Sequence, residues 1–229
     1  NECSTFELVC NNGEKIVVHR LLDPSYNDLN ARDNYGMTAF MLACKYGHKY
    51  VVQMLLYHSD INFNIKCYTF GETAFTYACR KGHREIVKLL MDHSDKNFKL
   101  DARDNFGRTA FMWACFNGHT DIAKLLLDHS DIDLTARDID GNTVLMYACS
   151  HGHTNVVKLI LDHSDNNIDL NAKNGYGQTA FMFACRKGHK DVVRLLLDHS
   201  DKYIDLNAND KDGMNAFEVA RNNGHTDLI

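Results

Sequence analysis

The segment Leu-Leu-Leu-Asp-His-Ser-Asp stands at residues 125–131 and again at 195–201, and it places a histidine, a serine and an aspartate side by side. These are the residue types of a hydrolytic triad, in which a base and an orienting carboxylate converge on one hydroxyl. The shorter motif His-Ser-Asp recurs at one register, beginning at His58, His93, His129, His163 and His199. A nucleophile needs one special environment, so repeated equivalent ones favour a structural role near helix C-termini. We therefore expect no catalytic residue and no enzyme.

A second pattern contains the residue types of a zinc site. Cysteine and histidine lie four residues apart in the pairs Cys44/His48, Cys79/His83, Cys115/His119, Cys149/His153 and Cys185/His189. Two such side chains on one helix face could bind zinc. However, a glycine precedes each histidine and is expected to end the helix, so that the two residues do not share a face. We expect no metal and no cofactor, and only the segment from His151 to His153 merits a local check.

Both patterns recur because the whole chain is an internal repeat. Equivalent glycines follow one another at a pitch of 34 to 36 residues, at Gly13, Gly47, Gly82, Gly118, Gly152, Gly188 and Gly224. The block around each glycine keeps its length, as in Thr-Ala-Phe-Met-Trp-Ala-Cys-Phe-Asn-Gly-His at 109–119. The connecting segments carry all the variation in length. Repeats of this period indicate stacked supersecondary units.

Each block is typical of two short helices. The first begins after a threonine, a good N-cap, at Thr38, Thr73, Thr109, Thr143 and Thr179. The glycine nine residues later suits a left-handed C-cap. The second helix has an apolar face, as at residues 86–90, and must bury it on a neighbouring repeat. The connecting segments end in Asp or Asn and Gly, which indicates protruding β-turn fingers.

The chain resembles the ankyrin-repeat family over essentially its whole length. A single repeat carries the matching residues Asp104, Gly107, Thr109, Ala114, Gly118, His119, Leu125 and Leu126. The resemblance implies an all-α ankyrin-repeat solenoid of stacked helix-turn-helix units with β-turn fingers. It also implies one domain, 1–229, with about seven repeats at 1–32, 33–67, 68–103, 104–137, 138–173, 174–209 and a partial 210–229. The family's first-helix histidine is replaced here by Met41, Thr76, Met112, Met146 or Met182. We expect this loss of a hydrogen bond to the threonine to loosen the start of the helix.

The charge, the hydropathy and the cysteines of the chain limit the kinds of partner and the cellular compartment that we expect for it. Lys and Arg number 25 against 30 Asp and Glu, and the net charge of -5 argues against nucleic acid. The sequence has no apolar run long enough for a membrane span. The repeated cysteines (Cys10, Cys44, Cys79, Cys115, Cys149, Cys185) replace a small apolar residue, and stacked helices lie too far apart for a disulfide. We expect a reduced, intracellular and cytoplasmic monomer.

The positions that differ among the copies are the candidates for binding a partner. By resemblance, the last turn of each first helix lines a concave groove. The candidate partner-binding residues there are Tyr77, Arg80, Lys81, Arg108, Trp113, Phe116, Tyr147, His151, Arg186 and Lys187; at the finger tips they are Tyr35, Phe70, Phe106 and Tyr176. Packing between repeats is an equal alternative for the aromatic residues. The finger at 65–71 has an extra residue and lacks the usual aspartate, so it should protrude differently.

These features predict a non-enzymatic interaction module or scaffold that binds a protein or peptide through the groove and the finger tips. An acidic or mixed partner surface is expected across the third to sixth repeats. The alternative is a substrate-recruiting ankyrin arm of a larger multidomain enzyme or effector, since the last repeat ends early and the chain could be a fragment. A third possibility is that Asn30, Asn64, Asn171 and Asn207 are substrates of an asparagine hydroxylase, as the resemblance implies.

Overall fold

The computed structural model describes residues 28–93, 98–129, 132–163, 168–198 and 204–228. The chain divides into two compact units, Asn1–Ala110 and Phe111–Ile229, which are described separately. The expectations for the first repeat, including Cys10, Gly13 and Pro24, and for His199 fall outside the described residues. The single-domain boundary 1–229 stays a prediction.

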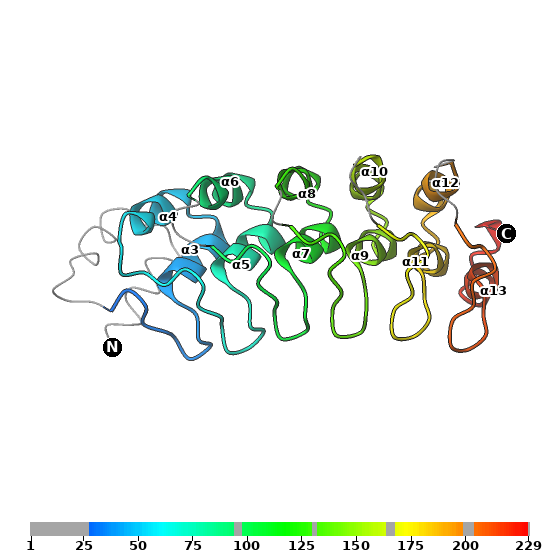
Figure 1. The fold of residues 1–229 in the computed structure, drawn as a ribbon, viewed down its shortest axis with the longest axis horizontal. Coiled ribbons are helices and arrows are strands. Elements are labelled where there is room, and N and C mark those ends of the chain that lie inside the picture. Colours follow the sequence, from blue (N-terminus) through cyan, green and yellow to red (C-terminus); the bar gives the residue numbers. More distant parts are fainter. Residues whose placement is uncertain (1–27, 94–97, 130–131, 164–167, 199–203, 229) are drawn as a thin grey trace. The chain divides into compact units, whose positions relative to one another are not determined.

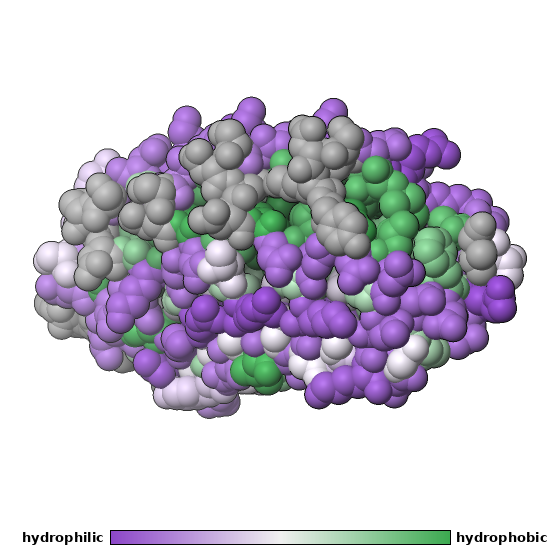
Figure 2. Space-filling model, turned by 45° about the vertical axis from the view of Figure 1, so that its right-hand side comes forward, coloured by the Kyte–Doolittle hydropathy of each residue, from purple (hydrophilic) through white to green (hydrophobic). Residues whose placement is uncertain are grey.

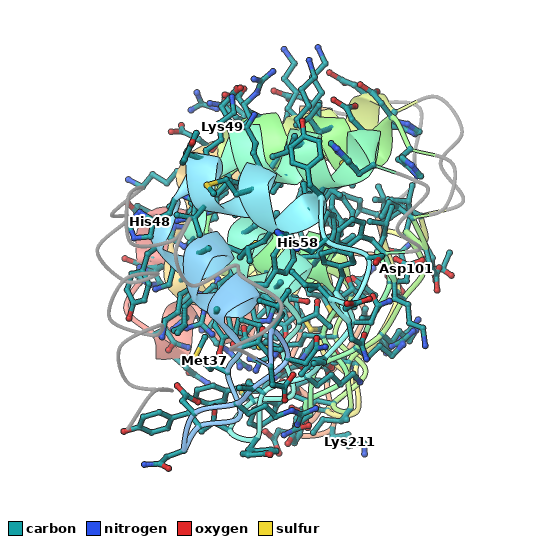
Figure 3. All side chains as sticks on the ribbon, turned by 90° about the vertical axis from the view of Figure 1, so that its left-hand side faces the viewer. Met37, His48, Lys49, His58, Asp101 and Lys211 are labelled. Atoms are coloured by element: carbon teal, nitrogen blue, oxygen red, sulfur yellow. The ribbon has the colours of Figure 1, made fainter. Side chains whose placement is uncertain are left out.

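Unit 1 contains two complete helical hairpins (Figure 1). The first consists of α3 (Ala39–Tyr46) and α4 (Lys49–Leu56), and the second of α5 (Ala74–Lys81) and α6 (Arg84–Asp92). The first helices α3 and α5 pack side by side in one layer, and α4 packs against α6 in a second layer. His48 lies in the turn between α3 and α4, and Asp101 lies in the turn that follows α6. The two residues are on opposite sides of these layers (Figure 3).

Unit 2 repeats the same arrangement. Its elements are α7 (Ala110–Phe116), α8 (Thr120–Leu127), α9 (Val144–Ser150), α10 (Thr154–Asp162), α11 (Ala180–Lys187), α12 (Lys190–Asp198), α13 (Ala216–Asn222) and a 3-10 turn, η2 (Thr226–Leu228). The first helices pack in the order α9, α11, α13, and the second helices in the order α8, α10, α12. No β-strand occurs in the part of the chain that the structure describes. The all-α repeat stack predicted from the sequence is therefore confirmed.

The predicted helix starts and stops are present. The hydroxyl oxygens of Thr38, Thr73, Thr143 and Thr179 accept hydrogen bonds from the amide three residues later. The glycines at the ends of the first helices have a positive φ, for example 71° at Gly118. A Cβ at Gly118 would also lie 2.5 Å from the ring of His153 in the next repeat. Glycine is thus required both by its backbone conformation and by the close approach of the neighbouring repeat.

The expected loosening of the helix start stays a prediction, but at three helix starts another side chain contacts the N-cap threonine in place of the missing histidine. The backbone amides of Thr143 and Thr179 lie 3.4 Å from the sulfur atoms of Met146 and Met182, respectively. At the equivalent place in α5, the hydroxyl groups of Thr73 and Thr76 lie 3.1 Å apart. Each side chain gives the N-cap residue a second contact.

The core consists of a phenylalanine in each of the first helices α3, α5, α7 and α11, of Leu145 at the same register in α9, and of the apolar faces of the second helices. Phe40 and Phe75 in unit 1, and Phe111 and Phe181 in unit 2, are almost fully buried. In unit 1, Phe63 packs edge-on against Phe40 with ring centroids 4.8 Å apart. Burying a side chain of this size stabilises a protein by about 1.5–3 kcal/mol relative to leaving it exposed.

The fingers are held by a capping side chain and by their neighbours. The Oδ1 atom of Asp104 accepts hydrogen bonds from the amides of Phe106 and Arg108, both at 2.9 Å. Within each unit, successive fingers are joined by backbone bonds, such as Tyr68 N to Tyr35 O at 2.8 Å and Lys211 N to Tyr176 O at 3.0 Å. The tips are therefore fixed relative to one another within a unit.

The finger at 65–71 differs from the others, as its sequence predicted. The amide of Gly71 donates to the carbonyl of Cys67 four residues earlier, whereas the amide of Gly107 donates to Asp104 three residues earlier. Cys67 takes the place of the capping aspartate and is buried. The extra residue thus widens the turn.

Candidate interaction surface

The histidines of the His-Ser-Asp motif bind backbone carbonyls at the ends of the second helices. His93 is the C-cap of α6, and its Nδ1 atom lies 2.7 Å from the carbonyl oxygen of Leu89. His163 follows α10, and its Nε2 atom lies 3.1 Å from the carbonyl oxygen of Leu127 in the preceding repeat. A histidine committed to a carbonyl at such a position satisfies a helix terminus. The structural interpretation of the motif accounts for both residues.

The cysteine and the histidine of a pair lie in different places: the cysteine is inside its own repeat, and the histidine contacts the preceding repeat. Cys79 is fully buried inside its repeat. His83 projects to the preceding repeat, where its Nε2 atom lies 3.0 Å from the carbonyl oxygen of Lys45. His153 and His189 make the same contact with Phe116 and Ser150. Because a carbonyl only accepts, Nε2 carries the proton in these rings. Among the described residues, no three His, Cys, Asp or Glu side chains gather as metal ligands do.

The described cysteines (Cys44, Cys67, Cys79, Cys115, Cys149, Cys185) are all buried free thiols. Burial raises the pKa of the Cys185 thiol to about 12, and it raises the pKa of Cys44, Cys115 and Cys149 further. Cys67 is different. Although burial opposes the shift, hydrogen bonds from the Tyr77 hydroxyl, at 3.4 Å, and from nearby groups of the finger hold the pKa of its thiol below the usual value.

The candidate asparagines join neighbouring repeats. The Nδ2 atom of Asn30 donates to the carbonyl of Asp60, and its Oδ1 atom accepts from the amide of Asn62, both at 2.7 Å. Asn171 makes the second of these bonds with Asp205 at 2.8 Å. These contacts give the asparagines a structural role. Their hydroxylation stays a prediction.

In unit 1, the candidate aromatic residue of the first helices is buried, whereas the lysines at the helix ends reach the surface. Only 3% of Tyr77 is exposed, so its ring is mainly packing. Lys81 is exposed at the end of α5. The ammonium group of Lys45 lies over the rings of Tyr46 and Tyr77, at 5.2 and 5.7 Å from their centroids. Tyr46 is 47% exposed and belongs to this surface, although it was not among the predicted contact residues.

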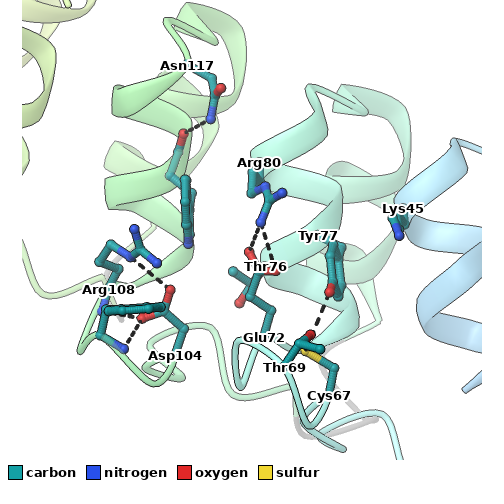
Figure 4. A network of polar contacts seen from close by, with 12 residues as sticks. Lys45, Cys67, Thr69, Glu72, Thr76, Tyr77, Arg80, Asp104, Arg108 and Asn117 are labelled. Atoms are coloured by element: carbon teal, nitrogen blue, oxygen red, sulfur yellow. Dashed lines mark hydrogen bonds and ion pairs between the residues drawn. The ribbon is translucent and has the colours of Figure 1, made fainter. Parts of the chain in front are cut away.

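Two candidate arginines of unit 1 are paired with buried carboxylates (Figure 4). Nη1 of Arg80 donates to both carboxylate oxygens of Glu72, at 2.8 and 2.9 Å. Nε of Arg108 donates to Asp104 at 3.0 Å. The charge that these arginines offer to a partner is therefore partly compensated by the fold, and their positions are fixed.

In unit 2, the candidate aromatic residues form one continuous cluster. Phe116 lies between Trp113 and Tyr147, with ring centroids 5.3 and 5.8 Å away, and the ring of His151 approaches it to 4.1 Å. Trp113 is 9% exposed, which makes it a support, whereas His151 is exposed. The Tyr147 hydroxyl donates to Asp138 at 2.5 Å, so this ring is fixed to the finger.

Two cations follow at the end of α11. Arg186 lies 3.9 Å from the carboxylate of Asp210 and 5.9 Å from the centre of the Phe183 ring. Lys187, the next residue, is exposed. Of the two predicted contact residues, Lys187 is therefore the more accessible charge.

The finger tips carry a series of exposed apolar side chains. The exposed fractions are 62% for Tyr35, 44% for Phe70 and 41% for Phe106 in unit 1, and 56% for Tyr176 in unit 2. Ile139, at 67%, is exposed in the same way at the tip of its finger, and so is Tyr68, at 61%, which was not among the predicted contact residues. In unit 2, a hollow of about 500 Å³ between two fingers is lined by Arg137, Ile139 and Tyr176 among others. The face of the molecule that Figure 2 shows is mostly hydrophilic, with smaller hydrophobic patches.

The family model for ankyrin repeats, described as three copies, matches residues 4–67, 55–138, 95–174, 130–210 and 166–229. Together these matches span nearly the whole chain, and the chain belongs to the ankyrin-repeat family. Ankyrin repeats are generally protein-interaction modules and typically lack catalytic activity. No curated protein matches the chain. Within the described residues, every helix is too short or too polar to cross a membrane.

Proposed function

We propose that this chain is an interaction module or scaffold that binds a protein or peptide partner through its finger tips and the last turns of its first helices. The observation that supports this most directly is the exposed apolar residue at the tip of finger after finger, at Tyr35, Phe70, Phe106, Ile139 and Tyr176. The fold does not use these side chains as core. Exposed aromatic residues on a fixed framework are typical of binding surfaces.

Exposure supports some of the candidate contact residues more directly than others. Phe116, Tyr147 and His151 in unit 2, and Tyr46, Lys45 and Lys81 in unit 1, are at least partly exposed. Tyr77 and Trp113 are buried and would act as supports beneath them. Rigid aromatic residues supply contact area at a low cost in conformational entropy, because their neighbours already hold them in place.

Phe116 gives the sharpest test because it is the centre of the unit 2 cluster. With the partner obtained by cross-linking to the full chain, Phe116→Ala should weaken binding by roughly 2 kcal/mol, about 30-fold in Kd. Trp113→Ala should also weaken binding, by removing the support of Phe116.

Lys124→Ala is the matched control, because Lys124 is exposed on the second helix α8. It should change the binding free energy by less than about 0.5 kcal/mol. Circular dichroism must show that each variant is folded. If folded Phe116→Ala binds normally while Lys124→Ala does not, the partner occupies the second-helix side instead.

A further inference from the structure

The finger face of unit 1 has cationic side chains at its surface, whereas its carboxylates are bound by groups of their own repeat. This face is defined as the fingers 31–37, 65–72 and 102–108 together with the last turns of α3 and α5. Its side chains at the finger tips and helix ends include Arg32, Lys45, Arg80, Lys81 and Arg108. Its carboxylates are Asp33, Glu72 and Asp104.

Each of these carboxylates is occupied by its own repeat. Asp33 accepts from the amides of Tyr35 and Met37. Asp104 accepts from two amides and from Arg108, and Glu72 is fully buried against Arg80. The charges of Glu72 and Asp104 are thus offset at short range by Arg80 and Arg108, and both carboxylates are buried, so that they repel an approaching anion little.

The cations stand beside exposed aromatic rings. The guanidinium of Arg108 lies 4.4 Å from the centre of the Phe106 ring, and that of Arg32 lies 5.2 Å from the Tyr68 ring. Lys45 is similarly placed over Tyr46. A cation held over a ring keeps its charge and loses conformational freedom before binding. This combination suits a ligand that offers carboxylates next to apolar side chains.

Unit 2 lacks this separation of charge. Its fingers carry Asp140 and Asp212 at exposed positions close to Arg137 and Lys211. The second helices of both units also mix the two signs, as in the pair Arg84 and Glu85. The finger face of unit 1 is therefore the part of the described surface best suited to an anionic ligand.

We propose that the segment bound by unit 1 is an acidic peptide with interspersed aromatic or aliphatic residues. This inference rests on the proposed function and adds the chemistry of the partner and the unit that selects it. Carboxylates of the peptide bind Lys45, Lys81 and Arg32, and its apolar side chains contact Tyr35, Tyr46 and Phe70. The chain's own net charge of -5 disfavours a nucleic acid backbone as the natural ligand.

A displayed library of random twelve-residue peptides, selected on the full chain, tests the proposal. The selected peptides should be enriched in Asp and Glu together with aromatic residues. The best of them, labelled with fluorescein, should bind in an anisotropy titration. The double variant Lys45→Glu/Lys81→Glu should weaken that binding at least 10-fold. Raising sodium chloride from 50 to 300 mM should slow the association.

The double variant Lys88→Glu/Lys124→Glu is the control, because it changes the net charge equally on the exposed faces of α6 and α8. It should alter Kd less than twofold. The proposal is overturned if the selection yields no binders, or if it yields basic peptides. It is also overturned if the two double variants weaken binding equally. A sixteen-nucleotide single-stranded DNA that displaces the peptide at equal concentration overturns it as well. A partner that loses affinity with Phe116→Ala but not with Lys45→Glu/Lys81→Glu would overturn this inference alone and leave the proposed function standing.

Discussion

Glu72 and Arg80 form an ion pair in which the carboxylate is completely buried and the guanidinium is only partly covered. The side chain of Glu72 is 0% exposed and that of Arg80 is 25% exposed. The pair joins the base of the finger at 65–71 to the last turn of α5, and it holds Arg80 6.0 Å from the centre of the exposed Phe70 ring. It thus links the stability of this finger to the shape of the surface that we propose to be functional.

Removing Arg80 should therefore destabilise unit 1. Arg80→Ala would leave the buried carboxylate of Glu72 without its ion partner, at a cost of about 3 kcal/mol in the free energy of unfolding. Urea unfolding monitored by circular dichroism measures this. Arg84→Ala is the control, since Arg84 pairs with the exposed Glu85, and it should leave the free energy of unfolding nearly unchanged. Equal losses in the two variants would show that burial of Glu72 does not matter.

Truncating the central core phenylalanine should be more costly. Phe111 is 1% exposed, so Phe111→Ala leaves a cavity and should lower the free energy of unfolding by about 3–5 kcal/mol. Tyr57→Ala, at a side chain that is 87% exposed, should change it by less than about 0.5 kcal/mol. A loss below about 1 kcal/mol for Phe111→Ala in urea would contradict its place in the core.

The chain should contain no disulfide. Unfolded in denaturant without reductant, freshly purified protein should titrate with all eight cysteines as free thiols. A native Cys79 to Cys115 crosslink found by mass spectrometry would disprove this. In the folded protein at pH 8, Cys67 should be alkylated before the other described cysteines, because its thiol alone among them has a lowered pKa.

Acid should destabilise the protein partly through His151. Although His151 is exposed at its edge, the Phe116 ring 4.1 Å away shields part of it from water, and this desolvation lowers the pKa of His151. A hydrogen bond to the Tyr147 carbonyl opposes this shift, and the nearby charges of His153, His189 and Lys187 reinforce it. Because the folded-state pKa is lower than the unfolded one, the unfolded chain binds the proton first as pH falls below about 6.5, and stability is lost in that range.

The variant His151→Asn separates this contribution from the other histidines. Its urea midpoint should fall less than that of the unsubstituted protein between pH 7.5 and 5.5. Identical pH dependence in the two proteins would mean that the environment of His151 does not disfavour its charge.

The repeat, the helix boundaries and the core could be read from the sequence because they depend on local spacing. A threonine followed by an apolar run and a glycine specifies a capped helix within about ten residues, and Thr38 and Gly47 do so in the structure. Phe40 and Phe75 stand at one register, two residues after the capping threonine, and both are buried. The different finger at 65–71 was also predicted, since one inserted residue must change the turn.

The exposure of the candidate binding residues was decided by tertiary structure. Tyr77 and Trp113 stand at the same register as Tyr147, yet the first two are buried and the third is partly exposed. The ion pairs Arg80–Glu72 and Arg186–Asp210 could not be predicted from the sequence either, because each joins the end of a helix to a finger. The sequence determines which residues form each repeating unit, through interactions along a few turns of chain. Which side chains remain available to a partner depends on how a finger folds back on its helix and how the next repeat, some 34 to 36 residues away, covers them.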